Sequence, residues 1–269
     1  MSRIREVAAN AAANNKKLLI PYVVAGDPNL ESTLPLLHQL VADGADIIEL
    51  GIPFSDPSSD GPVIQKGVER ALAGGTTLKD VLHLVATFRE TDTRTPVVLM
   101  GYLNPVERMG YQAFVDGAAQ AGVDGVLVVD MPPTEADGLR DRLQARDIDT
   151  IFLVAPTTTD KRCAQIAASC SGYLYYVSLK GVTGAALLDS ESVKRNIEKL
   201  RGLTELPIVI GFGIKDAQSA KTMGALADGV IIGSALVERV AQLGPSVSAE
   251  ETASATAVIR EAREALEQL

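Results

Sequence analysis

The sequence has few of the side chains that usually bind metals or act as nucleophiles. Its 269 residues include only two cysteines, two histidines and no tryptophan. His38 and His83 fall inside helical patterns, and Cys163 and Cys170 lie seven residues apart in one apparent helix. The sequence therefore has too few His and Cys residues for a metal site with several such ligands. We expect neither such a site nor a Ser-His-Asp triad. The two cysteines are expected to be free, buried thiols.

Long apolar runs and an excess of positive charge are also missing. No run approaches the roughly 18 to 20 apolar residues of a membrane span. The N-terminal segment "MSRIREVAANAAANNKKLLIPY" has no continuous apolar stretch of the secretory type. The net charge is −9 without a Lys/Arg cluster, which argues against nucleic acid and anionic membranes as partners. We therefore expect a cytoplasmic globular protein that binds neither.

What the sequence does contain is a regular series of short apolar runs. Each is nearly continuous in Val, Ile and Leu, as expected for parallel strands covered on both faces. Helical patterns separate most of them, with helix-start signals at Asp27-Pro28 and Asp216 and helix-stop signals at Gly44, Gly122 and Gly202. The runs are "KLLIPYVVAG" (17–26), "ADIIELGIP" (45–53), "PVVLMGY" (96–102), "GVLVVDMPP" (125–133), "DTIFLVAPT" (149–157), "GYLYYVSL" (172–179), "LPIVIGFG" (206–213) and "DGVIIGSAL" (228–236).

Eight strand–helix units in this length predict an α/β fold: a single-domain (β/α)8 TIM barrel over residues 1–269, with an extra N-terminal helix. An open, doubly wound sheet is the alternative. A nucleotide-binding version would carry G-x-G-x-x-G after its first strand, whereas "AGDPNL" stands there.

Polar residues concentrate where the predicted strands end, which is where (β/α)8 barrels have their active sites. Glu49 lies inside the apolar second run, and the loop after it holds Asp56 and Asp60. The stretch "LKGVTGAALLDSES" (179–192) after the sixth run suits a mobile lid. The seventh and eighth runs end in "GFG" (211–213) and "GS" (233–234). Exposed backbone N–H groups there could bind a phosphate monoester, although glycines can also be plain turn residues.

Several motifs resemble the tryptophan synthase alpha subunit family. They are "PYVVAGDP", "ELGIPFSDPSSDGPVIQ", "GYLNP", "GVTGA", "GFGI" and "ADGVIIGSAL", in order, from about Ile20 to Val240. The resemblance implies a (β/α)8 barrel that cleaves indole-3-glycerol phosphate to indole and glyceraldehyde 3-phosphate. It also implies an alpha2beta2 complex (a heterotetramer of tryptophan biosynthesis), in which the beta subunit holds pyridoxal phosphate and this chain holds no cofactor.

The resemblance also assigns roles to residues. Glu49 and Asp60 match the family's two catalytic carboxylates, Thr183 its lid threonine and Tyr175 a tyrosine of the pocket. One departure is Ser58-Ser59, where the family usually has an aliphatic residue and alanine; this puts signalling between subunits in doubt. The matched phosphate-binding positions are Gly184, Phe212, Gly213, Gly233 and Ser234.

Cleavage of the bond between indole C3 and the glycerol chain needs a proton donor at C3 and a base at the side-chain hydroxyl, and two carboxyl groups in different environments can divide this work. Burial should raise the pKa of Glu49, so that it can give a proton to C3 and take one from the side-chain hydroxyl. Asp60 should stay ionised and accept a hydrogen bond from the indole N–H. The alternatives without a catalytic role are that Glu49 pairs with a buried Lys or Arg and that Asp60 only shapes a turn. Asp56, before proline, ranks below Asp60.

The indole ring needs an apolar slot. Candidates in or at the ends of the predicted strands are Tyr22, Met100, Leu127, Val129, Leu153, Tyr175 and Phe212.

Two rival functions remain open from the sequence. One is a Schiff-base aldolase that acts on phosphorylated sugars through Lys180, which follows the sixth run. The other is an activator without catalytic activity that binds and switches a partner enzyme.

Overall fold

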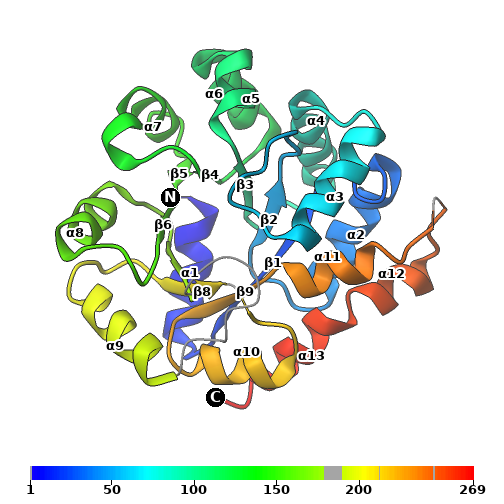
Figure 1. Ribbon diagram of the computed structural model, residues 1–269. Coiled ribbons are helices and arrows are strands. Elements are labelled where there is room, and N and C mark those ends of the chain that lie inside the picture. Colours follow the sequence, from blue (N-terminus) through cyan, green and yellow to red (C-terminus); the bar gives the residue numbers. More distant parts are fainter. Residues whose placement is uncertain (1, 179–189, 212, 245) are drawn as a thin grey trace.

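The strands form a ring with helices around it (Figure 1). The computed structural model describes residues 2–178, 190–211, 213–244 and 246–269. Within these residues the strands all pair in parallel. They are β1 (Leu18–Val24), β2 (Ile48–Gly51), β3 (Val97–Gly101), β4 (Gly125–Val128), β5 (Asp149–Thr150), β6 (Phe152–Val154), β7 (Leu174–Val177), β8 (Ile208–Gly211) and β9 (Gly229–Ile232).

The ring closes through the short strands β5 and β6. The order of neighbours is β5-β4-β3-β2-β1-β9-β8-β7-β6, and only Ile151 separates β5 from β6 along the chain. β5 pairs with β4 and β6 pairs with β7, while the Ile151 N–H donates to the Val126 carbonyl at 2.9 Å. The two pieces therefore occupy one strand position, so the described residues form the expected eight-position barrel.

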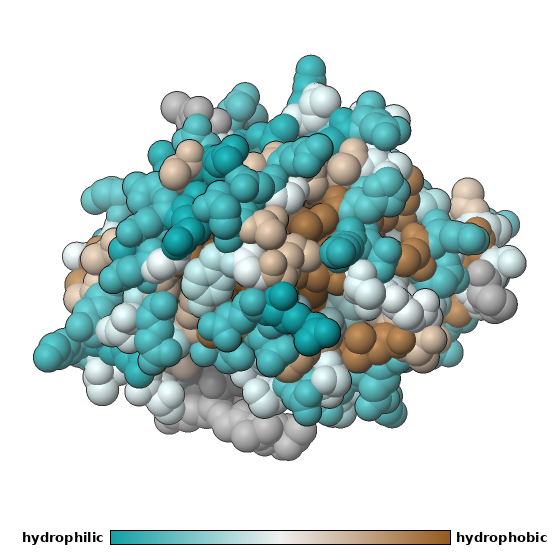
Figure 2. All heavy atoms as spheres, turned by 90° about the horizontal axis from the view of Figure 1, so that it is seen from above, coloured by the Kyte–Doolittle hydropathy of each residue, from teal (hydrophilic) through white to brown (hydrophobic). Residues whose placement is uncertain are grey.

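Helices follow most strands and cover the outside of the ring (Figure 1). None of the described helices is long and apolar enough to cross a bilayer. The side that carries α5 and α6 is mostly hydrophilic, with apolar residues gathered in one area (Figure 2). The helices are α1 (Arg3–Ala13), α2 (Leu30–Ala42), α3 (Pro62–Ala73), α4 (Leu78–Arg89), α5 (Leu103–Met109), α6 (Tyr111–Ala121), a 3₁₀ turn (Pro133–Glu135), α7 (Asp137–Gln144), α8 (Asp160–Ser169), α9 (Ser190–Arg201), α10 (Ala217–Gly224), α11 (Ser234–Val240), α12 (Ala249–Ala255) and α13 (Ala257–Leu266).

One of the two expected helix starts is confirmed and the other is wrong. Asp216 caps α10, and its side chain accepts from the Ser219 N–H at 2.8 Å. Asp27-Pro28 does not start a helix, because the N-cap of α2 is Asn29. The Asp27 carboxylate instead makes two hydrogen bonds to Arg70 of α3, at 2.8 and 2.9 Å. A buried carboxylate is better stabilised by a guanidinium than by free helix N–H groups alone, since the arginine also neutralises its charge.

The structure agrees with the expected helix ends at Gly122 and Gly202 and with a helical Cys163, but Cys170 lies outside the helix. Gly122 ends α6 in the left-handed conformation, and Gly202 directly follows α9. Cys163 is buried within α8 and free, as expected. Cys170 is free but is the residue just after α8, because the chain there turns to an extended conformation.

Alternate residues of each strand point into and out of the ring, as the two-residue period of a strand requires. In the second strand region Ile47 packs inside the barrel, and Ile48 and Leu50 pack against the helices. Glu49, between them, has the same parity as Ile47 and therefore points inward. The same rule places Tyr173 and Tyr175 inside.

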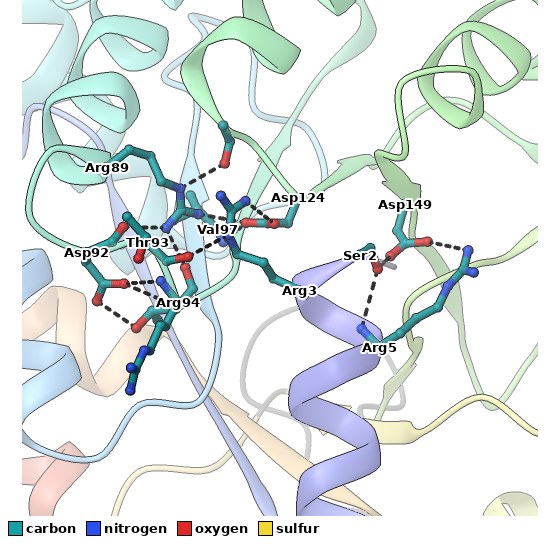
Figure 3. Close-up of polar contacts among 12 residues, drawn as sticks. Ser2, Arg3, Arg5, Arg89, Asp92, Thr93, Arg94, Val97, Asp124 and Asp149 are labelled. Carbon is teal, nitrogen blue, oxygen red and sulfur yellow. Dashed lines mark hydrogen bonds and ion pairs between the residues drawn. The ribbon is translucent and has the colours of Figure 1, made fainter.

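Helix α1 packs against the end of the barrel where the strands begin, and Figure 3 shows its polar contacts there. Ile4 is fully buried in the inner cluster. Arg3 and Arg89 both bind the Asp124 carboxylate, at 2.8 and 2.7 Å, just before β4. Ser2 donates to Asp149, the first residue of β5. These contacts fix α1 below the inner cluster, so any site must open at the opposite end.

Candidate active site

Glu49 is fully buried inside the barrel and has one polar partner among the described residues. On β2 it lies beside Tyr22 of β1 and Val98 of β3. Its Oε1 accepts a hydrogen bond of 2.5 Å from the Tyr173 hydroxyl, and none of the residues that the structure describes bonds to its Oε2. In the part of the chain that the structure describes, no Lys or Arg forms an ion pair with Glu49. Among these residues, Glu49 is therefore not held in an ion pair.

The surroundings of Glu49 change its acidity. Burial raises the pKa of Glu49 from 4.5 to about 7, and the hydrogen bond from Tyr173 works in the opposite direction. A carboxyl group with a pKa near the operating pH can both release and accept a proton. The free Oε2 is the atom through which that exchange can take place.

Asp60 lies in the loop that precedes α3 and is partly buried. Its Oδ2 accepts from the Tyr102 hydroxyl at 2.8 Å, and its backbone carbonyl accepts from the Gln65 side chain at 2.8 Å. Burial raises the pKa of Asp60 above its usual value, while the Tyr102 hydrogen bond lowers it. The carboxylate is thus less solvated than we expected of a loop residue. Asp56, by contrast, is exposed and accepts from its neighbour Ser55.

A cavity of about 720 Å³ opens where the strands end. Asp60 lines it, as do three of the residues expected to form the indole slot, Met100, Val129 and Leu153. Its outer wall comes from two loops, residues 130–133 after β4 and residues 157–159 after β6. Glu49 is not among the lining residues.

Tyr22, Leu127 and Tyr175 are buried in the inner cluster of the barrel rather than at the cavity wall. Burial and the negative charges of Glu49 and Asp60 raise the pKa of both Tyr22 and Tyr175. The two tyrosines therefore lie close to both carboxylates. Both rings need a glycine on the neighbouring strand. A Cβ at Gly51 would collide with the Tyr22 hydroxyl, and a Cβ at Gly211 would collide with the Tyr175 hydroxyl.

Three of the expected phosphate-binding positions are described, and they lie at the ends of neighbouring strands. Gly213 follows β8 with a φ of +76°, and Gly233 is the N-cap of α11, which begins at Ser234. β8 pairs with β9, so the two glycines follow the ends of neighbouring strands. Gly233 has no side chain to cap the helix, and no described side chain caps the first N–H groups of α11. Thr183, Gly184, Phe212 and the rival Lys180 lie outside the described residues.

The sequence reasoning missed two tyrosines that touch the carboxylates. Tyr173 lies two residues before Tyr175, so the two-residue period of a strand in "GYLYYVSL" predicts that both point inward. Tyr102 belongs to the motif "GYLNP" but was given no role. No pattern in the sequence shows that its hydroxyl reaches Asp60.

Comparison with known proteins places the chain among close relatives. The family model described as tryptophan synthase alpha chain matches residues 8–268. Tryptophan synthase alpha chains of Nitrosococcus oceani and Marinobacter nauticus are 52% and 53% identical over 269 residues, covering at least 99% of each chain. The crystal structure of the alpha subunit from Legionella pneumophila superposes with a TM-score of 0.91 at 43% identity, over 100% of both chains. The chain belongs to the tryptophan synthase alpha chain family.

Proposed function

We propose that this chain is the lyase of the alpha reaction, which cleaves indole-3-glycerol phosphate to indole and glyceraldehyde 3-phosphate, and that Glu49 and Asp60 do its proton chemistry. Membership of the family supports the reaction. The observation that carries the assignment of residues is the buried Glu49, with a pKa of about 7 and one oxygen that no described residue bonds to.

In the proposed mechanism Glu49 starts protonated and gives its proton to C3 of the indole ring. The ring nitrogen then gains positive charge, which the Asp60 carboxylate stabilises by accepting the N–H hydrogen bond. Glu49, now ionised, removes the proton of the side-chain hydroxyl. The carbon–carbon bond breaks as the carbonyl of glyceraldehyde 3-phosphate forms, and its electron pair neutralises the ring. Glu49 ends protonated, so the cycle balances.

The position of Glu49 below the cavity sets a geometric requirement. Either the ring enters the layer of Tyr22 and Tyr175, or the Glu49 side chain turns upward from Tyr173. The contact with Tyr173 is compatible with such a turn, because it is the only hydrogen bond of the carboxylate among the described residues.

The phosphate is proposed to bind at Gly213, Gly233 and Ser234, together with Gly184 and Phe212, with Thr183 closing near Asp60. Uncapped N–H groups at the start of α11 support this assignment, because a helix N-terminus favours an anion. Residues 1–269 would act as one barrel domain.

The proposal extends to the setting of the enzyme, a cytoplasmic alpha2beta2 complex whose beta subunit holds the pyridoxal phosphate. A structure from M. tuberculosis titled tryptophan synthase in an aminoacrylate-bound form contains a chain that is 31% identical to this one, with a TM-score of 0.87. Ser58 and Ser59 are exposed on the loop before α3, where they are available to a partner.

The test is indole release by the wild type, Glu49→Gln and Asp60→Asn, each alone and with a beta subunit. Both variants should lose turnover by several orders of magnitude while still folding and binding the beta subunit. Glu49→Gln removes the group that gives and takes the proton, Asp60→Asn removes the negative charge that stabilises the ring nitrogen, and each keeps the shape of the side chain. Because the chain has no tryptophan, indole fluorescence stands out from the protein.

Three results would contradict the proposal. Unchanged turnover in Glu49→Gln removes the acid–base role. Activation of the beta subunit without any indole release by the wild-type complex favours the activator. Inactivation by borohydride with substrate present, with the label on Lys180, favours the Schiff-base aldolase.

A further inference from the structure

Tyr102 is a buried tyrosine that bonds to two residues of the cavity wall, Ser59 and Asp60, and that the mechanism above does not use. It directly follows β3, is the N-cap residue of α5 and is 4% exposed. Its ring packs against Phe54, with centroids 5.5 Å apart and the planes tilted by 34°. The ring is therefore held both by the end of a barrel strand and by the loop that contains Asp60.

The Tyr102 hydroxyl connects two groups of that loop. It accepts a hydrogen bond from the Ser59 backbone N–H at 3.0 Å and donates one to Asp60 Oδ2 at 2.8 Å. A phenol has a single hydrogen to donate. Because the N–H of Ser59 occupies its acceptor side, that hydrogen is directed at the carboxylate.

We propose that Tyr102 is the positioning residue of Asp60: its hydroxyl fixes Oδ2, orients the carboxylate and leaves Oδ1 for the indole N–H. This inference rests on the proposed function, since it presumes that Asp60 meets the substrate. Oδ1 has no hydrogen bond to any residue that the structure describes. The end of a barrel strand thus holds a loop carboxylate by one hydrogen bond of 2.8 Å.

Electrostatics gives the contact a measurable signature. Burial raises the pKa of Asp60, and the hydrogen bond from Tyr102 opposes this rise by favouring the ionised form. Burial, and then the negative charge of Asp60, keep Tyr102 itself protonated, with its pKa well above the usual value. Tyr22 of β1 and Tyr175 of β7 also lie near Asp60, and their raised pKa values keep them neutral. Asp130 and Arg162 line the same cavity as Asp60, but neither is a hydrogen-bond partner of its carboxylate. Tyr102 is therefore the group whose loss should make Asp60 a weaker acid.

The experiment compares the wild type with Tyr102→Phe, which keeps the ring and its contact with Phe54. The carboxyl carbon of Asp60 is titrated by ¹³C NMR, with Asp60→Asn used for assignment, and kcat and KM for indole release are measured against pH. The pKa of Asp60 should rise, the acid limb of kcat should move to higher pH by the same amount, and kcat at neutral pH should fall about tenfold to a hundredfold, the usual effect of a hydrogen bond to a charged group.

Two further variants make the result decisive. Tyr176→Phe removes a buried phenol from the outer layer, where it accepts a hydrogen bond from Asn196 at 2.8 Å. This variant should leave the Asp60 titration and the pH dependence of kcat unchanged. Placing 3-fluorotyrosine at position 102 makes the phenol a stronger donor and should move the pKa of Asp60 down.

The outcomes separate the two proposals. An Asp60 titration that is the same in the wild type and both Tyr102 variants overturns the positioning role, even if kcat falls. Full turnover in Asp60→Asn overturns the catalytic role of Asp60, while the NMR titration still reports on the contact.

Discussion

The stability of the fold should depend on pH through Glu49 by an amount that follows from its burial. The folded-state pKa of about 7 lies above the value of 4.5 that applies to the unfolded chain. Each unit of difference corresponds to about 1.4 kcal/mol between the two protonation states. The neutral acid favours the fold at low pH, and this contribution is lost as the pH rises toward 7. The wild type should therefore lose about 3 kcal/mol relative to Glu49→Gln between pH 4.5 and pH above 7.

The measurement is urea unfolding of both proteins at half-unit steps from pH 4.5 to 8.5. Other groups with shifted pKa values, such as Asp27 and Asp60, are common to both proteins and cancel in the difference. Glutamine can still accept from Tyr173, so its remaining effect is a constant offset. A difference in unfolding free energy that stays flat across this range would show that Glu49 ionises as easily folded as unfolded, and the argument from burial would fail.

Three other predictions concern the walls of the barrel. Asp124→Asn should lower the unfolding free energy by about 3 kcal/mol in urea titration, because the nearly buried Arg89 loses its partner charge; a change below 1 kcal/mol would contradict this. Ile4→Ala should cost about 2 to 5 kcal/mol by thermal unfolding, since it opens a cavity at the closed end, and a smaller loss would mean that α1 readily repacks. Gly51→Ala should raise KM for the indole substrate with little effect on secondary structure by circular dichroism, because the new methyl displaces the Tyr22 ring, and an unchanged KM would place that ring outside the site.

Much of the fold could be predicted because continuous Val/Ile/Leu runs leave few alternatives to a parallel barrel. The confirmed helix start at Asp216 has the simple local chemistry of an N-cap. Asp27 has the same local pattern, but its carboxylate binds Arg70, 43 residues away, and no local signal reports such a distant contact. The break at Ile151 is another example: the two halves of one strand position each pair with a different neighbour.

The candidate site, too, could be predicted from the sequence only in part. The burial of Glu49 was readable from its apolar flanks and two-residue period. Its lack of a cationic partner in the described residues depends on side chains from other strands, which the local pattern does not specify. The hold of Tyr102 on Asp60 joins positions 42 residues apart and could only come from coordinates.

The cluster of tyrosines gives the protein a built-in optical reporter. Of its six tyrosines, Tyr22, Tyr102, Tyr173 and Tyr175 surround the two carboxylates, and there is no tryptophan to mask their absorption. Near-ultraviolet difference spectra of the unlabelled chain should consequently follow ligand entry and the ionisation of Glu49 directly, without a dye or an engineered probe.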